Sequence, residues 1–268
     1  MLWRVLTVFR QYQPQSVTMY STWRWLMQFP RELRWDLLAL LGDITFVTES
    51  QTEAFLAQGN HEVLSRLLID DLGPANIIYV ALDTAGSSSG VMLNVLRDRQ
   101  NMERRGARFI HSRDGDLMTR FSDELGSGAV VYVDDFAGSG NQFRRNRDAI
   151  APFITGNFAE FFVAGCICEE ALSRIEEVGV IPLPGLVHLR LERPLHNQTA
   201  TLRPERKEAL TALSKSIGGQ GLGFKRLATM VIFARNAPNS TPLLFRGSLQ
   251  QNPIRGIFPR WDDLPFSH

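Results

Sequence analysis

The chain has 268 residues, of which 44% are hydrophobic and 21% charged, as in ordinary soluble globular proteins. Its 29 basic and 28 acidic residues leave a net charge of +1, so the overall charge gives no reason to expect nucleic acid, a membrane surface or an acidic partner, although local patches stay open. No apolar run approaches the roughly 20 residues of a membrane span, and the arginine-interrupted start lacks a signal peptide's cleavage site. We therefore expect a cytoplasmic protein. Cys166 and Cys168 are too few for a disulfide framework and are expected to be buried thiols.

The first part of the chain predicts helices. Apolar residues recur at three- and four-residue spacing through residues 16–71. We expect this region to form a helical cap on the sheet that follows, with four aromatic residues in its core rather than at a site for a base or a partner: Trp23, Trp25, Phe29 and Trp35.

Two short strands come next. Residues 76–82 (NIIYVAL) read as a buried strand, followed by the small-residue loop 83–90 (DTAGSSSG) and a helix over residues 91–99. Residues 107–111 predict another strand. The polar, glycine-punctuated residues 112–128 have a length typical of functional or mobile loops.

Residues 130–143 (VVYVDDFAGSGNQF) organise the middle of the chain. Four apolar residues predict a strand buried on both faces, which we expect to end at Asp134 and Asp135. Small residues then allow a turn with inward N–H groups, and a helix is expected near Asn141. Such N–H groups and a helix dipole hold phosphate, while carboxylates accept hydrogen bonds from vicinal hydroxyls. The alternative role for the acids is to cap the helix.

The remaining elements alternate. Strands are predicted at residues 158–168, 186–191 and 227–233, helices at 169–178 and 204–216, and a flexible turn at 218–223. His188 shares its strand face with no acid or second histidine, so it is expected to be structural. The Asn- and Pro-rich tail should be an ordered wrap, from which three residues could read a base: Arg235, Asn236 and Asn239.

This order predicts an α/β fold with a mainly parallel, doubly wound sheet, an N-terminal helical cap and an irregular C-terminal tail. The expected segments are a cap at residues 1–75, an α/β core at 76–234 and a wrap at 235–268.

Residues 130–142 resemble the phosphoribosyl-diphosphate (PRPP) signature of the type I phosphoribosyltransferases: four apolar residues, two acids, two variable residues and a Thr/Ser- and Gly-rich loop. The resemblance implies that family's α/β fold, with Asp134 and Asp135 as the ribose-binding and catalytic acids. It also implies a loop that binds the 5′-phosphate, formed by Ala137, Gly138, Ser139, Gly140, Asn141 and Gln142. Gly138, Asn141 and Gln142 depart from the family pattern, which leaves backbone rather than side-chain contacts to the phosphate.

The resemblance extends to two other segments. The loop after the first strand takes the place of the pyrophosphate loop, with Asp83, Thr84, Ala85, Gly86, Ser87 and Ser88. Because this loop has no Lys or Arg, the resemblance implies Mg²⁺ as cofactor, and no metal ligand can be named. Residues 112–128 correspond to a closing hood, from which Arg113 and Arg120 would reach the diphosphate, with Arg104 and Arg105 behind them.

A narrower resemblance rests on WRWLMQF, VIFARNAPNSTPLLFRG and IFPRW, which look like a prokaryotic phosphoribosyltransferase-like effector family of conflict and defence loci, including retrons. It implies an anti-phage role, with a reverse transcriptase and its RNA–DNA product as partners.

Three functions stay open. The first is transfer or hydrolysis of PRPP at C1, and the second is a sensor or toxin module that binds a phosphoribosyl compound without turnover. The third is a serine hydrolase, because residues 86–90 (GSSSG) fit the G-x-S-x-G elbow with Ser88 as nucleophile. Its partners would follow in chain order: Asp134 or Asp135, then His188 or His196. Against it, the strand ends several residues before Gly86 and no oxyanion element precedes it.

Overall fold

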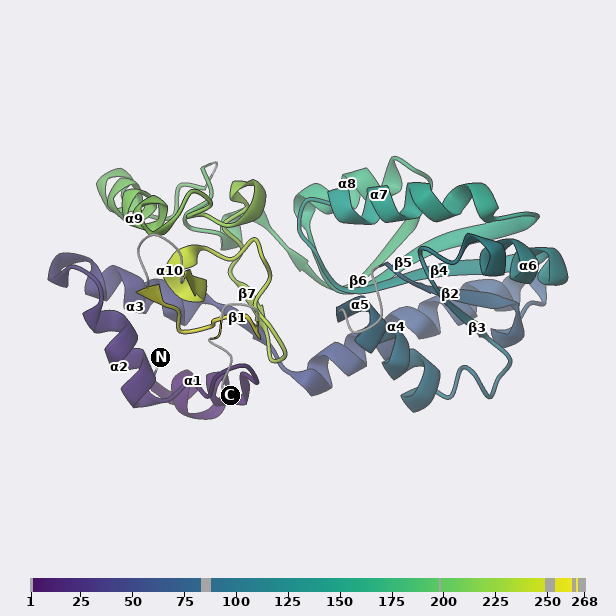
Figure 1. Ribbon diagram of the computed structural model, residues 1–268, viewed down its shortest axis with the longest axis horizontal. Helices are drawn as coiled ribbons and strands as arrows, with labels where there is room; N and C mark the ends of the chain where they lie inside the picture. Colours follow the sequence, from purple (N-terminus) through teal and green to yellow (C-terminus); the bar gives the residue numbers. More distant parts are fainter. Residues whose placement is uncertain (1, 83–87, 198, 249–253, 262–263, 265–268) are drawn as a thin grey trace. The chain divides into compact units, whose positions relative to one another are not determined.

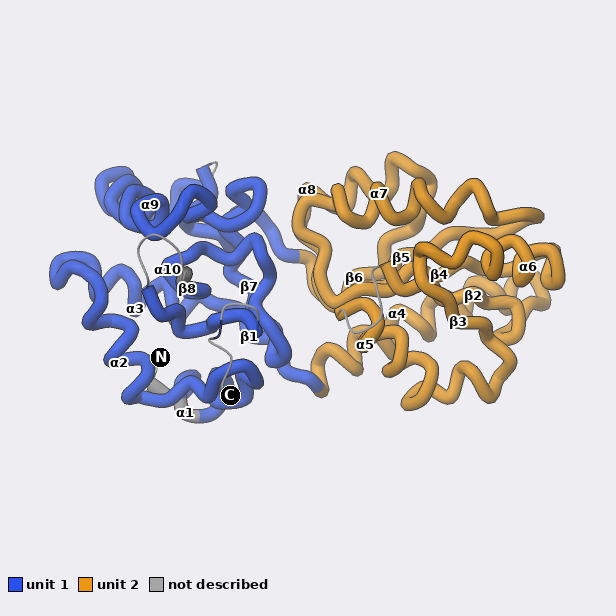
Figure 2. Tube along the Cα trace, in the orientation of Figure 1, with its two compact units in different colours: residues 1–49, 188–268 blue, residues 50–187 orange. Residues whose placement is uncertain are grey.

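The computed structural model describes residues 2–82, 88–197, 199–248, 254–261 and 264 (Figure 1). The chain divides into two compact units (Figure 2). Unit 1 comprises residues 1–49 and 188–268, and unit 2 comprises residues 50–187. The hydrophobic clusters respect this division, since one lies wholly in unit 1 and two lie wholly in unit 2.

Unit 2 contains a five-stranded sheet in the order β3-β2-β4-β5-β6. The pairs β2–β3, β2–β4 and β4–β5 are parallel. The strands are β2 (Ile77–Ala81), β3 (Arg108–His111), β4 (Ser127–Ala137), β5 (Asn157–Cys168) and β6 (Ile181–His188). Cys166 and Cys168 lie buried in β5 as thiols.

Helices cover both faces of this sheet, as Figure 1 shows, with α4 and α5 on one side and α7 and α8 on the other. On β2, Ile77 and Tyr79 pack in the cluster of α4 and α5, whereas Ile78 and Val80 pack in the cluster of α6, α7 and α8. The predicted α/β, doubly wound fold is therefore confirmed. The helices are α4 (Glu49–Leu67), α5 (Ser88–Asn94), α6 (Gly115–Leu125), α7 (Asn141–Ile150) and α8 (Glu169–Glu176), and α5 continues as a π-helical turn over Val95–Arg99.

The strand order identifies the edge of the sheet at which a ligand is expected. From β2 the chain goes to β3 on one side and returns to β4 on the other. The connections that leave β2 and β4 then run over opposite faces, through α5 and α7. Open α/β sheets bind ligands at such a switch point, outside the carboxyl ends of the strands.

Unit 1 joins the two ends of the chain in one core. The parallel pair β1 (Thr45–Val47) and β7 (Val231–Phe233) links them, beside an antiparallel pair, β8 (Gly247–Ser248) and β9 (Ile254–Arg255). Its helices are α1 (Leu2–Thr7), α2 (Met19–Met27), α3 (Arg34–Asp43), α9 (Pro204–Ile217) and α10 (Leu243–Arg246). Residues from both ends, such as Phe9, Trp25, Phe245 and Phe258, share this core. The units thus divide the chain differently from the cap, core and wrap segments expected above, because β7 pairs with β1.

Four local expectations are wrong. Residues 45–47, expected to be helical, form β1. The loop expected at residues 112–128 contains α6, whose polar face hid a stripe with buried Met118 and Ser122. The strand expected at residues 186–191 is β6, which spans Ile181–His188. Its two prolines argued against a strand, but β6 lies at the edge of the sheet, where proline is tolerated. The last strand expected at residues 227–233 is confined to β7.

Only two of the four aromatic residues expected in the core of the N-terminal helices are buried. Trp25 and Phe29 belong to the core of unit 1, but Trp23 is 57% and Trp35 80% exposed. The prediction that all four aromatic residues form a core is therefore wrong for Trp23 and Trp35.

None of the helices in the described part of the chain has the length and apolarity needed to cross a membrane.

Candidate functional site

The two acids lie within the end of β4 rather than after it. The strand continues to Ala137, and Asp134 pairs with Ala164 of β5. The neighbouring strand β2 ends at Ala81, opposite Val133. Asp134 and Asp135 therefore stand just beyond the end of β2, at the carboxyl edge of the sheet.

Asp134 is held by two hydrogen bonds. The Ser88 hydroxyl donates to its Oδ1 at 3.2 Å, and the Asp135 N–H donates to the same oxygen at 2.9 Å. Ser88, the last named residue of the expected pyrophosphate loop, is the first residue of α5. The structure thus brings Ser88 and Asp134 together from segments that follow different strands.

Asp134 is only 6% exposed, and its surroundings disfavour its charge. Burial raises the pKa of the Asp134 carboxyl well above its ordinary value, and the neighbouring Asp135 carboxyl raises it further. The Asp135 N–H and the Ser88 hydroxyl act in the opposite direction without outweighing burial. Carboxyls perturbed in this way cluster at functional sites, which makes Asp134, at the carboxyl edge of the sheet, a candidate site residue.

The expected phosphate loop turns at Gly140. This residue has φ +73°, and a Cβ there would lie 3.3 Å from the Cα of Ala171 in α8. The helix α7 begins at Asn141, as predicted, and has no side-chain cap. The idea that Asp134 and Asp135 cap this helix is therefore wrong. An uncapped helix N-terminus behind a glycine turn suits an anion.

Arg174 of α8 holds the same loop. Its Nη1 donates to the Ser139 carbonyl at 2.6 Å and to Asn141 Oδ1 at 2.7 Å. The sequence interpretation missed this residue. The sequence could have indicated it, because helices were predicted directly after β4 and after β5. Helices that follow neighbouring parallel strands begin at the same edge of the sheet, so α8 could be expected to start near the phosphate loop.

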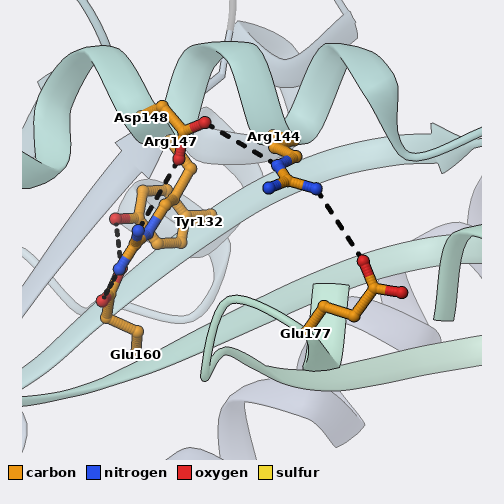
Figure 3. A network of polar contacts seen from close by, with 6 residues as sticks. All are labelled: Tyr132, Arg144, Arg147, Asp148, Glu160 and Glu177. Carbon is orange, nitrogen blue, oxygen red and sulfur yellow. Dashed lines mark hydrogen bonds and ion pairs between the residues drawn. The ribbon is translucent and has the colours of Figure 1, made fainter. Parts of the chain in front are cut away.

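A polar network anchors α7 to the strands beneath it (Figure 3). Arg147 Nε donates to Glu160 Oε2 at 2.9 Å and Arg147 Nη2 to Oε1 at 2.5 Å, while the Tyr132 hydroxyl donates to Glu160 Oε2 at 2.6 Å. On the solvent side, Arg144 lies 3.9 Å from Asp148 and 3.8 Å from Glu177. This network fixes the direction in which α7 presents its N-terminus.

The remaining candidates of unit 2 are less closely placed. Residues 83–87 lie outside the described residues. Arg113 is exposed and lines a cavity of about 590 Å³. It follows β3, and β2 lies between β3 and β4 in the sheet, so Arg113 is not next to the acid pair in the strand order. Arg120 lies in α6 and pairs with Glu124 at 3.0 Å. Arg104 and Arg105 belong to the turn before β3.

The hydrolase triad receives no support from His188, the first of its two candidate histidines. His188 Nε2 accepts from the Met230 N–H at 3.1 Å, and Nδ1 lies 3.1 Å from Glu192 Oε2. Both ring nitrogens are thus engaged, and Ser88 contacts a carboxylate directly. Alternation along the strand did not predict the acidic partner of His188, because Glu192 lies in the short 3-10 helix Arg190–Glu192 after β6 and not on the strand face.

All three proposed base-reading residues make hydrogen bonds within unit 1, Arg235 and Asn239 through their backbone carbonyls. The Arg235 carbonyl accepts from Trp261 Nε1 at 3.1 Å, and Asn236 Oδ1 accepts from the Ala237 N–H at 3.1 Å. For Asn239, the backbone carbonyl accepts from the Phe224 N–H at 3.1 Å.

The described residues contain no group of three or more His, Cys, Asp or Glu side chains that could hold a metal ion. Mg²⁺ is often bound by one or two carboxylates together with substrate phosphates. The donor set of Asp134 and Asp135 fits an ion that arrives with a diphosphate.

These features define a doubly wound α/β protein with an acid pair and a glycine turn at the carboxyl edge of its sheet. The family model PRTase-CE matches residues 23–260, and the chain belongs to this family. The predicted phosphoribosyltransferase-like family is thereby confirmed. A comparison with curated proteins gave no match.

Solved structures similar to this chain include three proteins. One is orotate phosphoribosyltransferase from Aeropyrum pernix, with 16% identity over 47% of this chain and 67% of that chain and a TM-score of 0.30. Another is the HGPRT-ase from Leishmania tarentolae in complex with GMP, with 13% identity over 53% and 80% and a TM-score of 0.35. The third is the AQ2163 protein from Aquifex aeolicus, with 14% identity over 63% and 83% and a TM-score of 0.34.

Proposed function

We propose that the protein binds PRPP or a related phosphoribosyl compound at the carboxyl edge of unit 2 and transfers or hydrolyses it at C1. The observation that carries this proposal is the meeting of Asp134, Asp135, Ser88 and the Gly140 turn at one edge of the sheet. Membership of the PRTase-CE family supports it.

The 5′-phosphate would bind at residues 137–142. The N–H groups of the turn and of the uncapped N-terminus of α7 supply donors, and the helix dipole favours negative charge. Arg174, already bonded to Ser139 and Asn141, adds a positive charge beside this loop.

The ribose would lie against the acid pair. Asp134 and Asp135 accept hydrogen bonds from the 2′- and 3′-hydroxyls, which replace part of the solvation that burial removes from Asp134. Mg²⁺, when bound with the diphosphate, supplies positive charge that the expected pyrophosphate loop lacks. Ser88 would lie next to both the ribose and the diphosphate.

Positioning would carry the chemistry. The bond from C1 to the diphosphate oxygen breaks, its electron pair leaves on pyrophosphate, and C1 forms a bond to an acceptor that loses a proton. With water as acceptor, the products are ribose 5-phosphate and pyrophosphate. An oxocarbenium-like state of this kind needs no side-chain nucleophile, so orientation and charge placement suffice. Arg113 and Arg120 would approach the diphosphate if the segment containing α6 moves towards the site.

The test is a thermal-shift titration with PRPP, ribose 5-phosphate and nucleoside monophosphates, with and without Mg²⁺, since a ligand that binds the native state raises its melting temperature. PRPP should raise the melting temperature of the wild type and not that of Asp134→Asn/Asp135→Asn. Asp70→Asn/Asp71→Asn, a pair of neighbouring exposed acids in unit 2, is the matched control and should keep the shift.

Pyrophosphate release separates an enzyme from a sensor. PRPP-dependent release that is lost in Asp134→Asn/Asp135→Asn supports catalysis. Binding without release identifies a non-catalytic phosphoribosyl-binding module. The absence of any shift with these ligands would contradict the proposal.

We place this activity in cytoplasmic anti-phage defence, on the resemblance of three sequence segments to effectors of such loci. A reverse transcriptase with its RNA–DNA product is the partner that this resemblance implies. Phage plating on cells that carry the complete locus should rise when Asp134→Asn/Asp135→Asn replaces the wild type, and unchanged plating would contradict the role.

A further inference from the structure

Unit 1 contains a cavity of about 660 Å³ along α2. Among the described residues, its lining includes two arginines and no acid: Gln15, Ser16, Tyr20, Ser21, Arg24, Trp25, Gln28, Arg255 and Gly256. A cavity of this volume matches the usual size of a small-ligand site. Its charge favours an anion, in contrast to the near-neutral chain as a whole.

An aromatic platform borders the cavity. Tyr20 is 65% and Trp23 57% exposed, and their rings stack with centroids 6.3 Å apart and an interplanar angle of 26°. The Arg24 guanidinium lies 5.6 Å from the Tyr20 ring centroid. Rigid, exposed aromatic faces beside a cation are the elements that proteins use to stack nucleobases.

The backbone that presents these groups is well fixed. Thr18 and Ser21 form a capping box at the start of α2, and Trp25 Nε1 donates to the Leu244 carbonyl at 2.7 Å. The Gln28 side chain accepts from the Arg255 N–H at 2.9 Å and donates to the Arg255 carbonyl at 3.0 Å. Arg24 and Arg255 therefore project from preorganised positions, which lowers the entropic cost of binding.

We propose that this cavity binds a nucleotide, either free or as part of a single-stranded nucleic acid. The base stacks on Tyr20 and Trp23, and the phosphate pairs with Arg24 and Arg255. A neutral aromatic ligand would leave both arginines without a charge partner, and a simple phosphate would leave the platform unused. This site lies in unit 1 and is independent of the function proposed for unit 2.

Fluorescence anisotropy with a labelled oligothymidylate of about 12 nucleotides tests the proposal in the full-length chain. Every variant is made in the Asp134→Asn/Asp135→Asn background, so that the site in unit 2 does not contribute. Tyr20→Ala should weaken binding roughly 5- to 150-fold, which is the affinity that stacking of one base on an aromatic side chain contributes. Tyr20→Phe should bind like the parent, because it keeps the ring. Arg24→Ala should weaken binding and reduce the slope against log salt by about 1.

Two matched controls lie in the same unit outside the cavity lining. Trp35→Ala removes another exposed aromatic side chain and Arg31→Ala another exposed arginine, and both should bind like the parent. Competition by uridine monophosphate identifies a free nucleotide as sufficient, whereas binding of the oligonucleotide alone identifies a single strand. The proposal is overturned if neither probe binds at low salt. It is equally overturned if Tyr20→Ala and Arg24→Ala bind like the controls while keeping the parent's circular dichroism and melting temperature.

Discussion

At the residue scale, the buried carboxyl of Asp134 makes the stability of the protein depend on pH. Its burial raises the pKa of its carboxyl, so the native state binds that proton more tightly than the unfolded chain, whose Asp pKa is about 3.9. Its contribution to stability is then present at low pH and is lost as pH rises from about 4 through the folded pKa.

We expect Asp134→Asn to remove this penalty. The amide oxygen can accept the same two hydrogen bonds without a charge. At neutral pH, without ligand, the melting temperature should rise by about 2 to 4 °C, a shift ordinary for about 1 kcal/mol in a protein of this size. The difference should shrink as pH falls towards about 4. Melting curves across this range, with Glu176→Gln as control, check the prediction, and a difference independent of pH would contradict it.

Arg174 should act as a positioning residue for the phosphate loop. Arg174→Ala removes two hydrogen bonds to that loop, and we expect PRPP binding to weaken about 10-fold, as for one or two lost bonds. Arg174→Lys keeps the charge but not the forked geometry, so it should recover only part of the affinity. Arg145→Ala, on the exposed face of α7, is the control in the same thermal-shift titration. Equal binding by Arg174→Ala and Arg145→Ala would show that Arg174 has no such role.

The sequence indicated the acids and the glycine turn because they occupy one continuous stretch. It did not indicate the contact of Ser88 with Asp134 or that of Arg174 with Ser139. Each of these joins segments after different strands, so it depends on strand order, which local periodicity does not contain.

At the scale of elements, α7 depends on the network of Arg147, Glu160 and Tyr132. Arg147 and Glu160 are 20% and 15% exposed as side chains, so water screens their interaction only in part. Burial also raises the pKa of the Tyr132 hydroxyl, and Glu160 raises it further, which keeps that hydroxyl a donor. The network therefore acts as one unit that holds α7 on β4 and β5.

Glu160→Gln places an amide NH₂ group against the donors of Arg147 or Tyr132. We expect it to lower the free energy of unfolding by about 1 to 3 kcal/mol, the cost of an unsatisfied buried polar group. Arg144→Ala, which removes only exposed ion pairs, should change it by less than about 1 kcal/mol. Urea denaturation of both variants measures the difference. Equal effects would mean that the network adds nothing beyond surface charge.

Continuous apolar runs and the glycine turn made most elements of unit 2 predictable, including β5 and the start of α7. The exceptions have identifiable causes. Pro182 and Pro184 hid β6, since proline is tolerated there only because the strand lies at the edge of the sheet. Gly115 and Gly126 border α6, and these glycines together with polar residues made a helix look like a loop.

For the whole molecule, the separate cores of the two units predict that residues 50–187 fold alone. Both hydrophobic clusters of the sheet lie within this segment. The isolated segment should show near-ultraviolet circular dichroism and a single cooperative melting transition, as small domains do. Residues 50–168, which lack α8 and β6, lose Ala171 and Ile175 from the core and should fail to fold. A molten 50–187 segment that binds hydrophobic dye would contradict the prediction.

The division into units was not visible in the sequence, although helices and turns at both ends were. The pairing of β1 with β7 joins short stretches from opposite parts of the chain, and neither stretch carries a mark of its partner. Composition also changes little across residues 49–50 and 187–188, so no linker announces the boundaries.

The sequence of unit 2 interrupts that of unit 1, and this order affects how the chain folds during synthesis. Ribosomes make residues 1–49 before unit 2 and residues 188–268 after it, so β1 emerges long before its partner β7. Domains generally fold as units during translation, and non-local pairings form late. Unit 2 can therefore form its core on the ribosome while the apolar faces of α2 and α3 are still exposed to solvent. During that interval these faces are a binding surface for a chaperone.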